Sequence, residues 1–482
     1  MTITLKKDIR VSGVVVPAGT TATYADDFEA DQVARGNAAY APGSPRFPGN
    51  SVPVLATPSE RGAAILGAGI NAAAALVGDI YQRPAVFDWV PPIIAYRIGA
   101  EIKTNYVAEI WQNPWVSAIW VSISRGNDTT GDGTVGNPYK SIKKGLQSVA
   151  ADYTNVLVEA GFYDRLNCWA GITPAYHINV YAVGGPVVSS VAWEGGAWTE
   201  TSAGSGTWRA SRSSFGRAID KTLNDENGVA IPVNVVASQV ACEALPHSVY
   251  ADRTYIYMHP HDGRTPQGDA NIVILMGITN CAFSVDKRYY IRGVEFQGGL
   301  NGSIATLSSS IGANARLVID NCSLTYSQIN GIGANGVPLV ISRQCIAYGN
   351  LADGFNYHQG SNAIDTKAVE IDCIAYSNGD PADSAMNDNL STAHENCRVM
   401  RVRTIGRGGY GPSFADVGTS RSWNIGCGPV GTKATGANAA SQAVAFQALD
   451  TAVQYLEDCY CDGVTPTYKA ATAAQVAVNC RF

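Results

Sequence analysis

Charge is scarce in this chain of 482 residues. Charged residues make up 15% of the sequence, against roughly 25% in an average soluble protein. The formal net charge is −6, and lysine and arginine form no basic stripe of the kind that phosphate binding needs. The most apolar stretch, residues 62–77, is rich in alanine and glycine and too short to span a bilayer. We therefore expect neither nucleic acid as a partner nor insertion into a membrane.

The beginning of the sequence does not have the pattern of a secretory signal peptide. Lys6, Lys7 and Asp8 interrupt it before an apolar core can form. The eleven cysteines include no CxxC pair combined with a second such pair or with HxxxH, which argues against a zinc site. We expect reduced thiols that pack as small hydrophobes, in a protein made in a reducing cytosol.

Other metal motifs are incomplete. His259 and His261 flank a single proline, and no further ligand is apparent beside them. Asp128 and Gly133 occupy the first and sixth positions of a calcium-loop pattern, but the twelfth is Tyr139 where a bidentate glutamate is required. We predict no metal and no other cofactor.

The chain does contain a repeated sequence motif. It occurs at Asn321–Tyr326, Gln344–Asn350 and Asp372–Asn378, with cysteines 23 and then 28 residues apart, a spacing typical of repeat architectures. Weaker echoes follow at residues 403–406, 426–428 and 458–460. Each repeat is a short apolar run closed by asparagine or glycine and has no helical period, so each predicts a strand and a turn.

Strands that recur in this way predict a solenoid in which each coil pairs with the next. Cys322, Cys345 and Cys373 are then expected to lie in register, one coil above another. Asn350 and Asn378 are expected to cap successive bends as a ladder of side chains.

The segment from Trp120 resembles the start of a known fold. Trp120–Asp128 leads into Gly131–Ile142, and this order of Gly-x-Asp followed by Asn-Pro-Tyr-x-Ser-Ile resembles the opening of a parallel β-helix of the pectate-lyase-like superfamily. The resemblance extends to about Tyr460. It implies an all-β fold, a right-handed single-stranded parallel β-helix with a capping helix after Ile142 and a small attachment region at the N-terminus.

The domain boundaries follow changes in composition. We predict a small N-terminal module, a linker and neck containing many prolines at its start, a parallel β-helix, an inserted β lobe within it, and a C-terminal cap or tail. The corresponding residues are 1–41, 42–116, 117–462, about 190–275, and 463–482.

The N-terminal module has a resemblance of its own. Val16–Thr20 and Arg35–Tyr40 resemble a short module of bacteriophage virion proteins. Together with the β-helix, this is similar to phage tailspikes and receptor-binding tail proteins, which are homotrimers that bind and often cleave bacterial surface polysaccharide. The resemblance implies a virion protein made in the host cytoplasm, with host polysaccharide as one partner and phage tail or baseplate proteins as another, through the N-terminus. No C-terminal trimerisation domain is recognised, so trimer formation would depend on the coils and the neck.

Loops after successive repeats carry acids and histidines at nearly equivalent positions. Adjacent coils are ~4.8 Å apart, close to the ~5–5.5 Å separation of the two catalytic carboxyls in retaining glycosidases. The distance across two coils is close to the wider carboxyl separation in inverting enzymes. The predicted catalytic residues are Asp353, Asp388, Glu395, Asp416, His358 and His394. The predicted substrate-binding residues are Asn356, Tyr357, Arg403, Arg407, Tyr410 and Phe414.

Three functions remain open at this stage. A glycoside hydrolase would use the stacked carboxyls as acid and base. A polysaccharide lyase would use His358 or His394 as the base and Arg403 or Arg407 to hold a uronate carboxylate. A structural or receptor-binding fibre without catalysis would need neither, because Asp-Gly is also a turn signal. The sequence identifies neither the glycan nor the host.

Overall fold

The computed structural model describes residues 79–482 except 213–214, 307, 381–389, 431–443 and 463–464, together with five short strands before residue 41. The chain divides into two compact units, Met1–Gly62 and Ala63–Phe482. The first unit contains an antiparallel sheet and a separate antiparallel pair. The sheet has the order β4 (Thr21–Thr23), β1 (Thr2–Leu5) and β5 (Ala38–Tyr40), and the pair is β2 (Ile9–Val11) with β3 (Val14–Val16).

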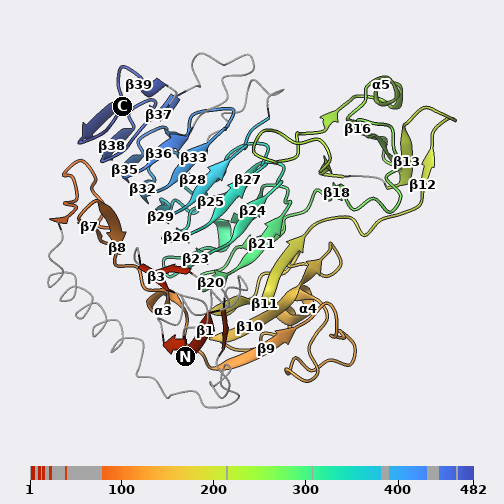
Figure 1. Cartoon of the computed structure of the whole chain (residues 1–482), viewed down its shortest axis with the longest axis horizontal. Helices are drawn as coiled ribbons and strands as arrows, with labels where there is room; N and C mark the ends of the chain where they lie inside the picture. Colours follow the sequence, from red (N-terminus) through yellow and green to blue (C-terminus); the bar gives the residue numbers. More distant parts are fainter. Residues whose placement is uncertain are drawn as a thin grey trace. The chain divides into compact units, whose positions relative to one another are not determined.

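The second unit is built on three long parallel sheets, which we call sheets I, II and III (Figure 1). Sheet I contains β9 (Ser117–Val121), β10 (Thr154–Tyr163), β11 (Ile178–Ser190), β20 (Arg288–Arg292), β23 (Arg316–Asp320), β26 (Val340–Arg343), β29 (Lys367–Ile371), β32 (Arg398–Val402), β35 (Arg421–Ile425), β38 (Val453–Glu457) and β40 (Ala474–Val478). Sheet II contains the second halves of β10 and β11, then β21 (Val294–Gln297), β24 (Ser323–Thr325), β27 (Ile346–Tyr348), β30 (Ile374–Tyr376), β33 (Ile405–Arg407) and β36 (Gly428–Val430). Sheet III contains β19 (Cys281–Phe283), β22 (Gly302–Thr306), β25 (Asn330–Asn335), β28 (Phe355–His358), β31 (Ser391–Ala393), β34 (Phe414–Asp416), β37 (Val444–Ala448) and β39 (Thr465–Lys469).

The chain visits the three sheets in turn, so each circuit forms one coil. Strands β20, β21 and β22 are followed by β23, β24 and β25, and each pairs in parallel with its equivalent one coil later. Parallel strands joined by such crossovers are right-handed in nearly all proteins. The predicted fold class, an all-β right-handed parallel β-helix, is confirmed. The predicted C-terminal cap or tail contains β39 and β40, which extend sheets III and I by one more strand each.

The corner between sheets I and II explains the cysteine repeat. One residue at each corner takes a left-handed backbone conformation, with φ of 52° at Asn321, 51° at Gln344 and 54° at Asp372. The next residue is a buried cysteine with a free thiol. The thiol of Cys345 contacts those of Cys322 and Cys373, and its Sγ donates to the carbonyl of Ile319 in the preceding coil at 3.4 Å. The predicted register of these cysteines is therefore confirmed.

The predicted asparagine ladder lies at the bend after sheet II. Asn350 Nδ2 donates to Asn378 Oδ1 at 2.8 Å and to the carbonyl of Leu324 at 3.1 Å. Asn378 Nδ2 donates in turn to the carbonyl of Ala347 at 3.0 Å. Both side chains are fully buried, so each satisfies bend backbone groups that water does not reach.

Short elements before and within the first coil cover parts of the β-helix. Helix α4 (Ile142–Gln147) follows the first strand as predicted, with the Ser141 hydroxyl accepting from the backbone N–H of Lys144 at 3.0 Å. Residues 79–112 form β6 (Asp79–Ile80), β7 (Ala95–Ile98), β8 (Glu101–Thr104) and α3 (Ala108–Trp111). Trp111 and Phe87 belong to the same apolar cluster as Val318 and Met400 of sheet I. This part of the predicted neck therefore packs on the outer face of sheet I.

The inserted lobe separates β11 from β19 and lies to one side of the coils in Figure 1. It contains a five-stranded sheet, an antiparallel strand pair and one helix. The sheet has the order β12 (Trp198–Glu200), β13 (Trp208–Ser211), β17 (Tyr255–His259), β16 (Ser248–Ala251), β15 (Asn234–Val235); the pair is β14 (Arg217–Asp220) with β18 (Ile272–Leu275), and the helix is α5 (Gln239–Ala244). Within the described ranges, no helix is both long enough and apolar enough to cross a bilayer.

Candidate functional site

The structure separates the predicted site residues by the face of the coil on which they lie. Along sheet III, alternate side chains point inward and outward. Tyr357, Phe414 and Asp416 point inward and are completely buried. Asp388 falls outside the described residues.

Asp416 belongs to an ion pair inside the coil. Its Oδ1 lies 3.2 Å from Nη2 of Arg401, and its Oδ2 accepts from the Ser422 hydroxyl at 2.5 Å. Arg401 and Asp416 are both 0% exposed. The expectation that Asp416, Tyr357 and Phe414 contact a substrate does not hold, because no substrate reaches the closed interior of the coil.

The predicted arginines and Tyr410 are not gathered at one place. Arg403 occupies a corner between sheets I and II, where its guanidinium donates to both oxygens of Asp372 at 2.6 Å and to the carbonyl of Ile102. Arg407 is exposed at the end of β33 in sheet II, and Tyr410 follows it in the bend. Arg403, Arg407 and Tyr410 therefore lie apart from the predicted histidines, which are at the ends of strands of sheet III.

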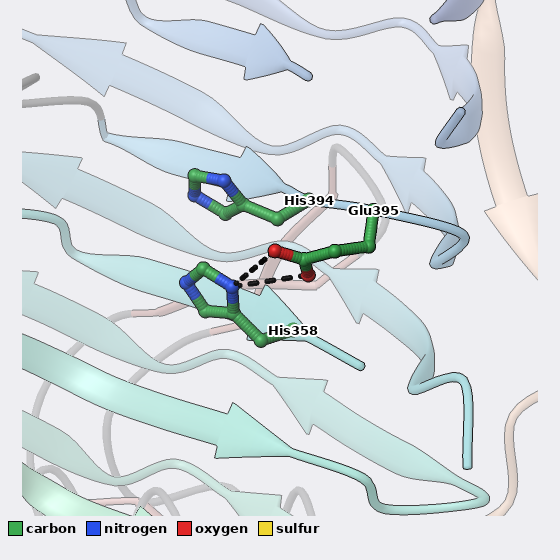
Figure 2. A group of neighbouring side chains, drawn as sticks. All are labelled: His358, His394 and Glu395. Atoms are coloured by element: carbon green, nitrogen blue, oxygen red, sulfur yellow. Dashed lines mark hydrogen bonds and ion pairs between the residues drawn. The ribbon is translucent and has the colours of Figure 1, made fainter. Parts of the chain in front are cut away.

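Three of the remaining predicted residues, His358, His394 and Glu395, meet at the C-terminal ends of strands β28 and β31 of sheet III (Figure 2). His358 ends β28 and His394 follows β31, so the two lie on adjacent coils with their rings stacked at a centroid distance of 3.9 Å. Glu395 Oε2 lies 3.1 Å from His358 Nδ1. Asn356, on the outward side of β28, places its Nδ2 3.4 Å from His394 Nε2 and also donates to Asp353.

The electrostatics of this cluster do not favour a general base. Burial, together with a smaller effect of the neighbouring His358, lowers the pKa of His394 to about 3. A base with so low a pKa is nearly always unprotonated but has little affinity for a substrate proton at neutral pH. Asp353 is buried and holds the Asn356 amide at the start of β28. The cluster supplies two imidazoles and one half-exposed carboxylate.

A second site, which the sequence did not predict, lies between the lobe and the outer face of sheet II. This cleft has a volume of about 330 Å³. Its lining comes from three segments: the first coils, sheet II and the lobe loop that follows β14. The lining residues are Phe162, Val188, Lys221, Asn224, Gly228, Glu295, Gln297, Tyr326 and Tyr348.

Glu295 gives this cleft its distinctive chemistry. Burial raises the pKa of the Glu295 carboxyl, while a hydrogen bond from Thr325 and the charge of Lys221 act in the opposite direction. The Thr325 hydroxyl donates to Glu295 Oε1 at 3.1 Å. In the next coils the equivalent outward positions are Ser323 and Ile346. Glu295 is therefore the one carboxyl among the lining residues, and its pKa is raised.

Tyrosine rings continue from the cleft along sheet II. Tyr326 meets Tyr348 edge to face at 5.5 Å, and Tyr348 stacks on Tyr376 at 5.0 Å with an interplanar angle of 15°. Arg407 follows Tyr376 in register on the next strand. The signal was present in the sequence, since each repeat contains a tyrosine at or near its end. The strand pairing was needed to show that these tyrosines form one row beside Glu295.

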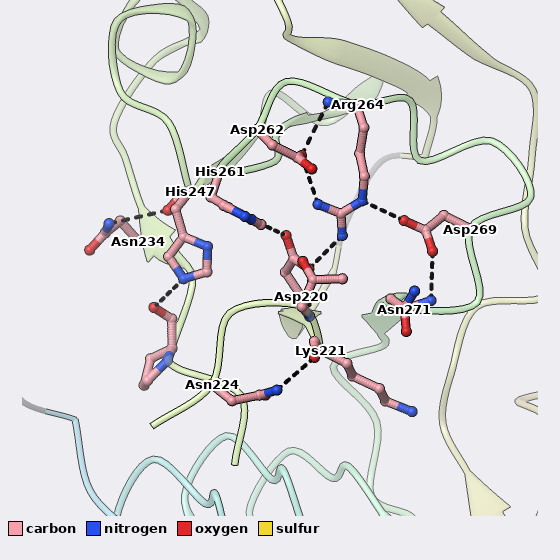
Figure 3. Close-up of polar contacts among 12 residues, drawn as sticks. Asp220, Lys221, Asn224, Asn234, His247, His261, Asp262, Arg264, Asp269 and Asn271 are labelled. Carbon is pink, nitrogen blue, oxygen red and sulfur yellow. Dashed lines mark hydrogen bonds and ion pairs between the residues drawn. The ribbon is translucent and has the colours of Figure 1, made fainter. Parts of the chain in front are cut away.

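An ion-pair network supports the lobe side of the cleft (Figure 3). Arg264 pairs with Asp220 at 2.5 Å, Asp262 at 2.7 Å and Asp269 at 2.6 Å. Asp220 immediately precedes Lys221, whose carbonyl accepts from Asn224 Nδ2 at 2.9 Å. The network thus holds the backbone from which Lys221 and Asn224 face the cleft.

No protein-family model matches this chain, and neither does any curated protein. Three solved structures align with much of it. A glycoside hydrolase is 11% identical with a TM-score of 0.44, covering 76% of this chain and 96% of that one. XylC in complex with xylose is 13% identical with a TM-score of 0.38, covering 73% and 70%. Pectate lyase Pel9A is 13% identical with a TM-score of 0.37, covering 75% and 78%. Similarity at this level adds nothing to what the strand register establishes about the fold.

Proposed function

We propose that this protein binds a polysaccharide in the cleft between the lobe and sheet II. The observation that carries the proposal is the cleft itself, in which Tyr326 and Tyr348 face Lys221 and Asn224 around the carboxyl of Glu295. Tyrosine rings stack on the C–H faces of sugars, and polar groups at the rim bond to hydroxyls. The row that continues through Tyr376 to Arg407 offers contacts to further sugar units of a chain.

The biological setting we propose is a bacteriophage tail. The resemblance of residues 1–41 to a virion module supports attachment of the N-terminus to tail or baseplate proteins. The ligand is then a polysaccharide of the host surface, and the assembled protein is a homotrimer formed in the host cytoplasm before it joins the virion. Electron microscopy of particles labelled at the N-terminus, and the mass of the purified protein in solution, would test these assignments.

Hydrolysis of the bound glycan is a second candidate function, favoured by the elevated pKa of Glu295. A carboxyl that stays protonated to higher pH can donate a proton to the glycosidic oxygen as the bond breaks. Because hydrolysis also needs a carboxylate opposite the acid, we assign that role to Asp225. Its charge and that of Glu295 both raise the pKa of Tyr326, so both acids lie within electrostatic range of that side chain.

Binding is tested with capsule and lipopolysaccharide fragments from candidate hosts. Tyr348→Ala is expected to weaken binding on the order of tenfold, which is ~1.4 kcal/mol. Tyr468→Ala is the control, because Tyr468 is an exposed tyrosine on β39 of sheet III, away from the cleft. Equal affinity of the two variants, or no binding of any bacterial glycan by the parent protein, would contradict the proposal.

Cleavage is tested separately with Glu295→Gln. The variant is expected to keep glycan affinity and to lose the release of reducing ends by about 10²–10⁴-fold. Glu109→Gln on α3 is the matched control, because that helix lies on the side of sheet I. Ultraviolet absorbance of unsaturated uronates distinguishes a lyase from a hydrolase. Unchanged cleavage by Glu295→Gln would remove the hydrolytic role, while binding without cleavage by the parent would identify a non-catalytic receptor-binding protein.

A further inference from the structure

The cluster of His358, His394 and Glu395 forms a constellation that neither the glycan cleft nor the coil interior uses. His358 and His394 come from adjacent strands of sheet III, because Tyr357 pairs with Ala393 and each histidine follows. Both side chains point outward, and His358 is 31% exposed. In Figure 2 the two rings lie one above the other with the Glu395 carboxylate beside them.

The backbone at Glu395 is held in an uncommon conformation. Its φ is 44°, in the left-handed region that non-glycine residues rarely adopt. The carbonyl of Glu395 accepts from the backbone N–H of Thr419 at 2.8 Å and from its hydroxyl at 3.1 Å. A Cβ on Gly418 would lie 2.9 Å from Glu395 Cα, so glycine is needed for this close approach. The next coil thus fixes a turn that brings the carboxylate to His358.

The donor atoms are close enough to converge on one ion. One ligand atom from each of the three residues lies within 4.8 Å of the others. Bonds of about 2.0–2.1 Å in a tetrahedral site place donors roughly 3.4 Å apart. Because a ring nitrogen binds a metal ion in the plane of its ring, sharing one ion requires the two imidazoles to turn out of their parallel stack.

The surroundings provide for the remaining positions of such an ion. Asn356 is 4% exposed, its amide contacts His394, and its Oδ1 has no hydrogen-bond partner. A water bound to an ion beside His394 could donate to this oxygen. The half-exposed Glu395 leaves the other side open to solvent. Two imidazoles and one carboxylate are the donors that zinc and neighbouring transition metals prefer, whereas calcium and magnesium prefer oxygen alone.

We propose that His358, His394 and Glu395 bind a divalent transition-metal ion, with Zn²⁺ as the best match, and leave at least one position for water. The site joins two neighbouring coils at the C-terminal ends of strands β28 and β31 of sheet III. The histidines are far apart in sequence and fit no short metal motif, which is why sequence inspection predicts no metal. Among the described residues, the pair His261 and Asp220 has a similar histidine–carboxylate contact of 3.2 Å, but it does not belong to a group of three ligand atoms within 4.8 Å of one another.

The test uses the full chain, freed of metal with a chelator and titrated with Co²⁺ and Zn²⁺ alone. We expect one ion per chain and a Co²⁺ visible spectrum of four- or five-coordinate geometry. His394→Gln, His358→Gln and Glu395→Gln should each weaken binding by at least tenfold. The matched control is His261→Gln, because His261 has the same 31% side-chain exposure as His358 and also contacts a carboxylate; its affinity should not change.

X-ray absorption of the Zn²⁺-loaded parent protein keeps the proposal falsifiable if a histidine variant fails to fold. Scattering from two imidazoles without sulfur is the expected result. Sulfur ligands would instead indicate binding by the cysteines, and the proposal would be wrong. It would be equally wrong if the parent showed no saturable binding below about 1 mM, a weak free energy of ~4 kcal/mol, or if Glu395→Gln bound like the parent.

Discussion

Two arginine networks in this protein both pair a guanidinium with carboxylates, but their surroundings differ. In the coil, Arg401 lies between Glu370 and Asp416, with Nε 3.7 Å from Glu370 and Nη2 3.2 Å from Asp416, and all three side chains are 0% exposed. In the lobe, Arg264 pairs with three aspartates and is 23% exposed. Water reaches Arg264, Asp262 and Asp269 of the lobe network, although Asp220 is 0% exposed. The coil ions have only each other and nearby polar side chains.

The pKa shifts show the same contrast. Burial raises the pKa of Glu370, and the charge of Arg401 only partly opposes this. Burial also raises the pKa of Asp220, but hydrogen bonds from Arg264 and Thr222 outweigh it, so the pKa lies below its usual value. The two carboxyls thus shift in opposite directions, because Glu370 is completely buried with one nearby cation whereas Asp220 accepts several hydrogen bonds.

The largest expected effect is on the coil. Arg401→Met leaves Glu370 and Asp416 buried without a cation, and we expect a loss of about 3–5 kcal/mol in the free energy of unfolding. Urea denaturation followed by tryptophan fluorescence measures this. Arg264→Met is the control in the lobe, with a smaller expected loss of about 1–2 kcal/mol. Asp262 and Asp269 keep contact with water, and the buried Asp220 keeps its contacts with Thr222 and His261. Equal losses in the two variants would show that burial does not distinguish the networks.

A smaller effect separates the two networks by pH. Asp220 has a depressed folded pKa, so its contribution is present above the unfolded value of ~3.9 and is lost as the pH falls below it. Glu370 has a raised folded pKa, so its contribution is present at low pH and is lost as the pH rises. On acidification from about pH 4 to about pH 2, hydrogen exchange corrected for intrinsic rates should increase in β13 and β17 of the lobe before β29 and β32. Loss of protection first in the coil would contradict the assigned signs.

The smallest effect concerns thiol reactivity and leaves stability unchanged. Burial raises the pKa of Cys345 well above the usual thiol value. A hydrogen bond from Cys459 lowers the pKa of the half-buried Cys480 to about 7. Brief alkylation at pH 8, read by mass spectrometry, should therefore modify Cys480 and spare Cys345, because the thiolate is the reactive form. Cys345 modified as fast as Cys480 would mean that the coil opens readily at its middle.

Local patterns predicted the fold well because a solenoid repeats local rules. Cysteines follow the left-handed corners at Asn321, Gln344 and Asp372, and asparagines occupy two of the following bends. The coils could therefore be predicted from the spacing of these cysteines. The start of the β-helix was predicted from the resemblance that begins at Trp120, and the lobe from the interruption of the coils at about 190–275. The packing of residues 79–112 on the outer face of sheet I was not predicted, because Phe87 and Trp111 contact strands hundreds of residues away in sequence.

The candidate site was predicted less completely. The sequence placed His358, His394 and Glu395 on equivalent loops, and the structure brings them together. It also grouped Asp416, Tyr357 and Phe414 with them, since inward and outward residues alternate with a period of two and a shift of one residue exchanges the faces. Glu295 and Lys221 were missed because they meet across the junction of lobe and coil.

The sequence by itself determined a stack of short strands, the residues that turn each corner, and the order of lobe and coils. Those features depend on backbone conformation and on neighbours one coil away, which repeat along the chain. Only the tertiary structure decided which acids are enclosed with Arg401, which one faces the cleft, and which histidines share an edge. Those outcomes depend on burial and on contacts between segments distant in the sequence, and no local pattern records them.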